Sequence, residues 1–184
     1  MKRKYLLFYI LLLFRSIPVS AGWQRPVTNY TRHTYKAGNQ SWSIQQHDNG
    51  WIYVANNKGL LEFDGVEWNT YPIHNAKTRA VKVGHDGRIY IGGMEQFGYF
   101  TPNRLGGLEY TCLSDSLSPN VNVGVIWNIL LDGERVYFQS DRRFFYWEEG
   151  IVKKIDYSSE IYTSLILRNK LYITSTCLLY TSPS

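Results

Sequence analysis

Residues 43–65 read SIQQHDNGWIYVANNKGLLEFDG, and this stretch decides the fold. A short segment, 43–46, leads through a polar turn into the apolar residues 51–54, and a second turn leads into 60–63. The turns are built from Asp, Asn and Gly, which tolerate the positive φ angles that tight hairpins need. The stretch therefore predicts three consecutive antiparallel β-strands joined by hairpins.

The same pattern recurs along the chain, each time around a central tyrosine. These tyrosines are 37, 47 and 35 residues apart, and they are Tyr53, Tyr90, Tyr137 and Tyr172. A fourth strand with alternating character follows in the first and third units, at 66–71 and 151–155. Repeats of about 40 residues that contain four short strands are typical of β-propeller blades.

The predicted fold is all-β, with three and a half four-stranded blades of a larger propeller in residues 42–176. The second interval between central tyrosines is longer than the other two. We assign its extra residues to a connection at 102–122, which is rich in Pro, Gly, Ser and Asn. No segment shows a sustained helical period. The blades are expected near 42–74, 78–113, 125–156 and 161–176.

Three and a half blades cannot close a ring, because propellers use about 4–8 blades and closure protects the sheet edges. We therefore interpret the sequence as the front part of a longer protein. Residues 177–184 fit the blade pattern poorly and are interpreted as a tail of non-native origin. Residues 22–41 are expected to lead into the first blade.

Residues 1–21 predict a signal peptide. A basic start (2–4) precedes ten apolar residues (5–14), and small residues at 19–21 suit signal peptidase. Ten apolar residues fall short of the roughly 20 that span a bilayer, so a membrane anchor is the less favoured alternative. We expect cleavage after Ala21 and export to the periplasm.

The positive net charge comes from this leader. The chain has 20 basic and 15 acidic residues, and four of the basic residues lie in 1–21, which leaves 16 against 15 in the remainder. Nucleic-acid binding needs clustered positive charge on the folded domain, so it is not expected. The two cysteines, Cys112 and Cys177, lack zinc-ligand spacing, and neither a metal nor a cofactor is expected.

The hairpin turns carry acidic and histidine side chains that resemble catalytic or metal-binding groups. The repeat places them on separate blades, and Asp beside Gly commonly binds its own turn backbone. We therefore interpret them as structural, and we predict no catalytic residue. The repeat-turn residues are Asp48, Gly50, Asp86, Gly87, Asp132 and Gly133, and His47 and His85 are interpreted likewise as turn residues.

The candidate ligand-binding residues follow from propeller geometry. Residues before each inner strand and in the loop after each second strand should surround one mouth of the central channel. Aromatic faces with amide and charged groups can hold a polar ligand such as a sugar. The alternative is that the tryptophans belong to the blade core and the loops are simply solvated. The candidates are Trp42, Asn56, Asn57, Arg79, Glu95, Gln96, Trp127, Asp141 and Arg142.

The first unit resembles the two-component regulator propeller repeat, in which a turn with Asp and Gly leads into an Ile-Trp/Tyr-Val/Ile strand, followed by a Gly-Leu strand that ends in Asp-Gly. Residues 96–100, QFGYF, are similar to an element of the N-terminal propellers of Bacteroidota sensor-regulators. The resemblance covers roughly residues 40–175. The residues that carry it in the first unit are Asp48, Gly50, Ile52, Tyr53, Val54, Gly59, Leu60, Phe63, Asp64 and Gly65.

This resemblance implies an extracytoplasmic sensor at the periplasmic face of the inner membrane. It also implies a three-tyrosine domain, a membrane helix, and a kinase or DNA-binding output, all downstream. The expected function is non-catalytic ligand sensing, with an oligosaccharide or another small polar molecule as ligand and a homodimer as candidate assembly. The alternatives are a secreted propeller hydrolase or lyase and a passive protein-interaction scaffold.

Overall fold

The computed structural model describes residues 27–74, 77–175 and 179–181. The first sheet contains β1 (Ser41–Gln46), β2 (Ile52–Asn56), β3 (Gly59–Phe63) and β4 (Trp68–Tyr71). The second contains β5 (Thr78–Val83), β6 (Ile89–Gly93), β7 (Phe97–Pro102) and β8 (Leu108–Cys112). The third contains β9 (Asn128–Asp132), β10 (Arg135–Gln139), β11 (Arg143–Glu148) and β12 (Ile151–Asp156). The fourth contains β13 (Ile161–Leu167), β14 (Lys170–Ser175) and β15 (Leu179–Thr181).

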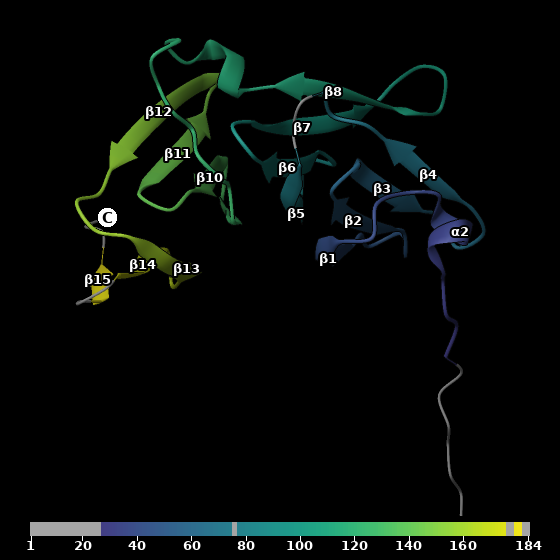
Figure 1. Ribbon diagram of the computed structural model, residues 1–184. Helices are drawn as coiled ribbons and strands as arrows, with labels where there is room; N and C mark the ends of the chain where they lie inside the picture. The colour runs from purple at the N-terminus through teal and green to yellow at the C-terminus, as the bar shows by residue number, and fades with distance from the viewer. Residues whose placement is uncertain (1–26, 75–76, 176–178, 182–184) are drawn as a thin grey trace, which may run out of the picture.

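The sheets are propeller blades, as the sequence predicts. Every sheet is antiparallel, and each strand pairs with its neighbours in sequence. Figure 1 shows the four sheets along an arc, with β1, β5 and β13 on its concave side and β4, β8 and β12 on its convex side. The inner strands β1, β5, β9 and β13 contact one another in order. The concave side is therefore the wall of the central channel.

The core lies between the blades. The middle strands β2, β3, β6 and β10 are buried along nearly their whole length, since apolar residues face both neighbouring sheets. Between the second and third blades, the rings of Phe97 and Phe138 lie 4.5 Å apart, and Phe97 lies 5.1 Å from Phe145. All three rings are fully buried. Aromatic packing thus joins one blade to the next.

A segment before the first strand covers the outer face of the first blade. It contains α2 (Arg32–Tyr35), a single helical turn that the sequence analysis does not predict, which ends at Lys36 in the left-handed conformation. The Tyr30 ring lies 5.0 Å from that of Phe63 and 5.5 Å from that of Trp68. One turn is too short to produce a helical period in the sequence.

Two boundaries differ from the expectation. The predicted connection at 102–122 contains β8 and the 3-10 turn η1 (Ser114–Ser116), so the irregular part is shorter than predicted. The fourth sheet extends beyond residue 176, because β15 pairs with β14 as a third strand. The predicted signal peptide lies outside the described residues. No helix in the described ranges has the length and apolar character needed to cross a membrane.

The packing between blades predicts a large effect of Phe138→Ala. Removal of this fully buried ring leaves a cavity beside Phe97, so the free energy of unfolding should fall by about 3–5 kcal/mol. Urea denaturation followed by fluorescence measures the change. The control Leu105→Ala alters a side chain that is 95% exposed and should leave stability nearly unchanged. Equal effects of the two substitutions would contradict the interblade core.

Candidate ligand site at the propeller mouth

Antiparallel pairing brings the predicted site residues to one edge of the blades. The first residue of each inner strand pairs with the end of the second strand, as Thr78 does with Gly93 and Asn128 with Gln139. The start of an inner strand and the loop after the second strand therefore lie side by side in every blade. This edge forms the mouth of the channel.

Three inner strands carry a β-bulge at their second position. The bulged residues are Trp42 in β1, Arg79 in β5 and Tyr162 in β13, each flanked by paired residues. A bulge leaves its extra residue outside the ladder and redirects the side chain. In the third blade Trp127 directly precedes β9, and its N–H donates to the Gln139 carbonyl at 2.9 Å. Each blade thus places one large side chain at the mouth.

Tyr162 is the mouth residue that the sequence analysis missed. It is 65% exposed and lines a hollow of about 400 Å³ together with Asp141 and Arg142. The sequence feature that identifies Tyr162 is its distance from the central tyrosine of the fourth blade. Tyr162 precedes Tyr172 by ten residues, as Trp127 precedes Tyr137, and the interval is eleven residues in the first two blades.

Side chains of the first two blades form a connected group at the mouth. The Asn57 Oδ1 atom accepts hydrogen bonds from Trp42 Nε1 at 3.0 Å and from Arg79 Nη1 at 2.8 Å. Arg79 Nη1 also donates to the Thr78 carbonyl at 3.0 Å. The guanidinium carbon lies 4.1 Å from the centre of the Trp42 ring, which is cation–π geometry. These contacts hold the ring and the cation in fixed positions.

The third blade continues this group. The Trp127 ring stands edge-on to the Trp42 ring at 6.2 Å, and its Nε1 donates to Asp141 Oδ1 at 2.6 Å. Trp42 and Trp127 are 44% and 45% exposed among the described residues. The structure therefore brings together five of the predicted residues from three blades. We call Trp42, Asn57, Arg79, Trp127 and Asp141 the mouth cluster.

Arg79 carries an unsatisfied charge within this cluster. Its Nε atom is buried and has no hydrogen-bond partner among the described residues. Burial lowers the pKa of the guanidinium below its usual value, which reflects the cost of desolvating a cation. An unpaired buried donor costs about 1–3 kcal/mol. The fold tolerates this cost at the mouth.

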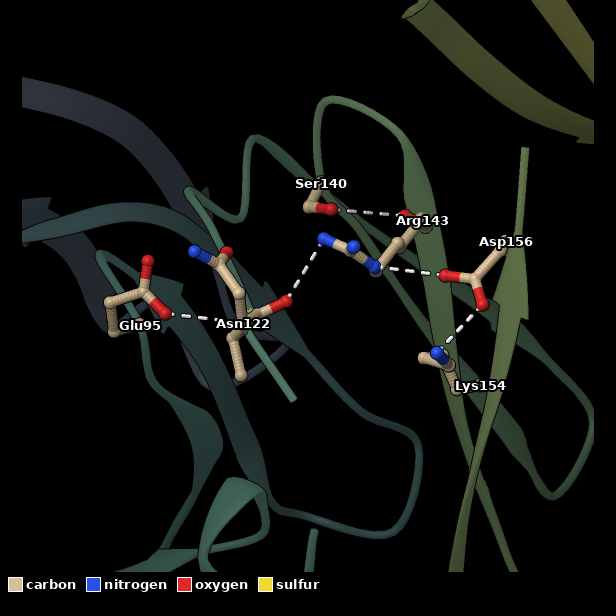
Figure 2. Close-up of polar contacts among 7 residues, drawn as sticks. Glu95, Asn122, Ser140, Arg143, Lys154 and Asp156 are labelled. Carbon is tan, nitrogen blue, oxygen red and sulfur yellow. Dashed lines mark hydrogen bonds and ion pairs between the residues drawn. The ribbon is translucent and has the colours of Figure 1, made fainter. Parts of the chain in front are cut away.

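Glu95 and the loop of the third blade hold the connection between blades (Figure 2). The Glu95 carboxylate accepts hydrogen bonds from the N–H groups of Val123 and Gly124 at 3.0 and 3.1 Å. Arg143 donates to the Asn122 carbonyl at 3.0 Å and to Asp156 at 2.9 Å. Side chains of the second and third blades thus bind the same segment, which connects the two sheets. Glu95 is exposed, and its carboxylate is engaged by this connecting segment.

The remaining predicted residues lie near the mouth but outside the cluster. Asn56 is fully buried, and its amide exchanges two hydrogen bonds with the Gly38 backbone, at 2.9 and 2.8 Å. Gln96 is partly buried, and its carbonyl accepts the Gly93 N–H at 2.9 Å. Arg142 is exposed and pairs with Glu160 at 3.1 Å. Asn56 therefore fixes the chain before the first blade.

The repeat-turn residues lie at the opposite edge, in the hairpins between first and second strands. Gly50, Gly87 and Gly133 have φ angles of 89°, 77° and 58°, which favour glycine. In the first blade Trp51 N–H donates at 2.9 Å to Asn49, the residue after Asp48. Asp132 pairs with Arg135 across a two-residue loop. The described residues contain no group of three or more His, Cys, Asp or Glu that could hold a metal.

Asp86 binds both its own turn and the core. Its Oδ1 accepts the Arg88 N–H at 3.0 Å, and its Oδ2 accepts the Tyr90 hydroxyl at 2.7 Å and an Arg88 Nη1 bond at 2.6 Å. Partial burial acts to raise the pKa of Asp86, but the hydrogen bonds from Tyr90 and Arg88 outweigh it. The pKa of Asp86 therefore lies below its usual value.

The sequence matches no family model and no curated protein. The fold is similar to the extracellular domain of BT4673 from B. thetaiotaomicron, assigned both as a one component and as a hybrid two component system. The TM-score is 0.58 at 13% identity, over 78% of this chain and 20% of that chain. Virginiamycin B lyase from Staphylococcus aureus gives a TM-score of 0.59 at 15% identity, over 74% and 50% of the two chains.

YCF48 from Cyanidioschyzon merolae is a third similar structure, with a TM-score of 0.58 at 9% identity over 79% of this chain and 51% of that chain. The chain spans a fifth of the BT4673 domain and about half of the other two proteins. At these identities the likeness establishes the propeller fold and leaves activity open.

The contacts of Asp86 predict a pH-dependent contribution to stability. Because its pKa is lower in the folded than in the unfolded chain, the carboxylate stabilises the fold above the unfolded pKa. This stabilisation is lost as the pH falls through the folded pKa. The melting temperature of Asp86→Asn should lie below that of the unsubstituted chain at pH 7, and the difference should shrink progressively as the pH falls below about 4.

The variant Tyr90→Phe removes one donor to Asp86 and should weaken the same pH dependence. Thermal melts at pH 3 to 7 measure both substitutions. A difference between Asp86→Asn and the unsubstituted chain that stays constant across this range would contradict the role of the carboxylate.

Proposed function

We propose that this chain is the ligand-sensing propeller region of an exported transmembrane signalling protein, and that it binds a polar ligand, an oligosaccharide, at the mouth cluster. The observation that carries the proposal is the pair of half-exposed rings of Trp42 and Trp127, held beside a cation and a carboxylate. In this role the chain binds its ligand without chemical conversion.

The mouth cluster has the physical properties of a binding surface. Both indole N–H groups are hydrogen-bonded, Trp42 to Asn57 and Trp127 to Asp141, so each ring has a fixed orientation. Rings that are already ordered lose little conformational entropy on binding. Their apolar faces suit the C–H faces of a sugar, while amide and charged groups suit its hydroxyls.

Signalling requires that binding alter the contacts between blades. The Asp141 carbonyl accepts the Ile161 N–H at 2.7 Å, and the Arg142 carbonyl accepts the Tyr157 N–H at 2.9 Å. The loop that holds Trp127 therefore also holds the connection into the fourth blade. A ligand that binds one arrangement of this loop more tightly shifts the population of blade arrangements. The similarity to the BT4673 extracellular domain supports this proposal at the level of the fold.

The second candidate is a propeller lyase. Its support is the similarity to virginiamycin B lyase, which is as strong in fold as the similarity to the sensor domain. A lyase places reactive groups around its substrate, whereas the mouth cluster offers one carboxylate and one guanidinium already engaged with neighbours. Chromatography and mass spectrometry of an oligosaccharide after incubation distinguish the two functions, since a lyase converts the ligand into new products whereas a sensor releases it unchanged.

The aromatic pair predicts the effect of Trp127→Ala on binding. A glycan array followed by calorimetry identifies and measures the ligand, and the variant should weaken binding about tenfold or more, since aromatic anchors dominate such surfaces. Trp51→Ala is the matched control, because Trp51 is 36% exposed but lies in the hairpin at the opposite edge. Equal affinity of the two variants would place the ligand elsewhere.

A further inference from the structure

The positive charge of Arg79 distinguishes the mouth cluster from a site for neutral polar ligands. Four of the eight described arginines form an ion pair with a carboxylate, whereas Arg32, Arg79, Arg104 and Arg168 form none with the described residues. Arg32, Arg104 and Arg168 are exposed, so water solvates them. Arg79 alone in this group is partly buried and lacks a counter-ion.

The partner that Arg79 does have is a neutral ring. The carboxylate-paired arginines are Arg88, Arg135, Arg142 and Arg143. Arg79 instead stacks on Trp42 at 4.1 Å. Its Nη1 atom donates to the Asn57 side chain and to the Thr78 carbonyl, which are neutral acceptors as well. The positive charge is therefore held in place but not neutralised.

The guanidinium of Arg79 keeps one NH₂ group without an acceptor. Nη1 is engaged by Asn57 and Thr78, and Nε is buried without a partner, so neither of them is free to receive a ligand. The described residues supply no acceptor to Nη2. This group can therefore donate to a carboxylate oxygen in a charge-assisted hydrogen bond, which is stronger than a bond between neutral groups.

We infer that the mouth cluster binds an acidic saccharide, whose carboxylate pairs with Arg79 while its sugar ring lies against Trp42 or Trp127. This inference rests on the proposed function and names the class of its ligand as uronic-acid oligosaccharides. Asp141, the carboxylate of the cluster, is exposed and accepts the Trp127 indole N–H, so solvent screens its charge from the ligand. The cation is partly shielded from water and therefore dominates the choice of ligand.

The test uses calorimetry with pairs of probes that differ only in charge. Oligogalacturonides and glucuronate-containing xylan oligosaccharides are each compared with their carboxyl-reduced, neutral forms. We expect an acidic probe to bind at least tenfold more tightly than its neutral form, with an affinity that falls as salt is raised. In Arg79→Gln the acidic and neutral forms should bind equally.

Two further variants separate recognition from folding. Arg79→Lys keeps the positive charge without the planar group that stacks on Trp42, and should retain only part of the preference for the acidic probe. Arg104→Gln removes an exposed arginine and should leave the preference unchanged. Circular dichroism and thermal melts establish that each variant is folded before its affinity is compared.

The outcomes distinguish this inference from the proposed function. The unsubstituted chain could bind the acidic and neutral forms equally and lose both in Trp127→Ala. That result would overturn the inference that the ligand is acidic, but it would still support a saccharide site at the mouth cluster. If Arg79→Gln no longer binds either form, Arg79 supports the site without discriminating between charged and neutral ligands. This result would also overturn the inference. Binding of neither form of any probe would count against a saccharide site at this mouth.

Discussion

The fold depends on one constraint, which is that each blade has two apolar faces and cannot bury either of them alone. The second strands of the first three blades, β2, β6 and β10, are buried along nearly their whole length, and Phe97, Phe138 and Phe145 meet between the second and third blades. Each sheet is therefore stable only beside its neighbours, as in other repeat architectures. The first blade meets the same requirement with the segment that carries Tyr30 and α2.

This stacking also produces the mouth cluster. Because the inner strands contact one another in order, side chains more than eighty residues apart, such as Trp42 and Trp127, come within 6.2 Å. Hydrogen bonds between blades hold the same edge, since the Thr78 hydroxyl donates to the Asn56 carbonyl at 2.6 Å. The site is thus assembled from loops of separate blades, and its geometry reports how those blades are packed.

The sequence predicts the blades well because their signals are local. Hairpin turns with glycine and strands around a central tyrosine repeat at visible intervals, and the structure has these strands within a few residues. The mouth was predicted from topology, but topology gives no side-chain partners. It did not show that Asn56 and Glu95 have structural roles, because their hydrogen bonds to Gly38 and Val123 join segments distant in sequence. Tyr162 was missed although it precedes Tyr172 by ten residues, the same interval that separates Trp127 from Tyr137.

The bulges at the starts of the inner strands have a consequence for how such a protein can diversify. A bulged residue lies outside the ladder, so its identity is not fixed by pairing or by the core. This chain carries a tryptophan, an arginine and a tyrosine at the three equivalent bulges. Evolution can therefore exchange these side chains one blade at a time, altering what the mouth recognises while the scaffold beneath it stays the same.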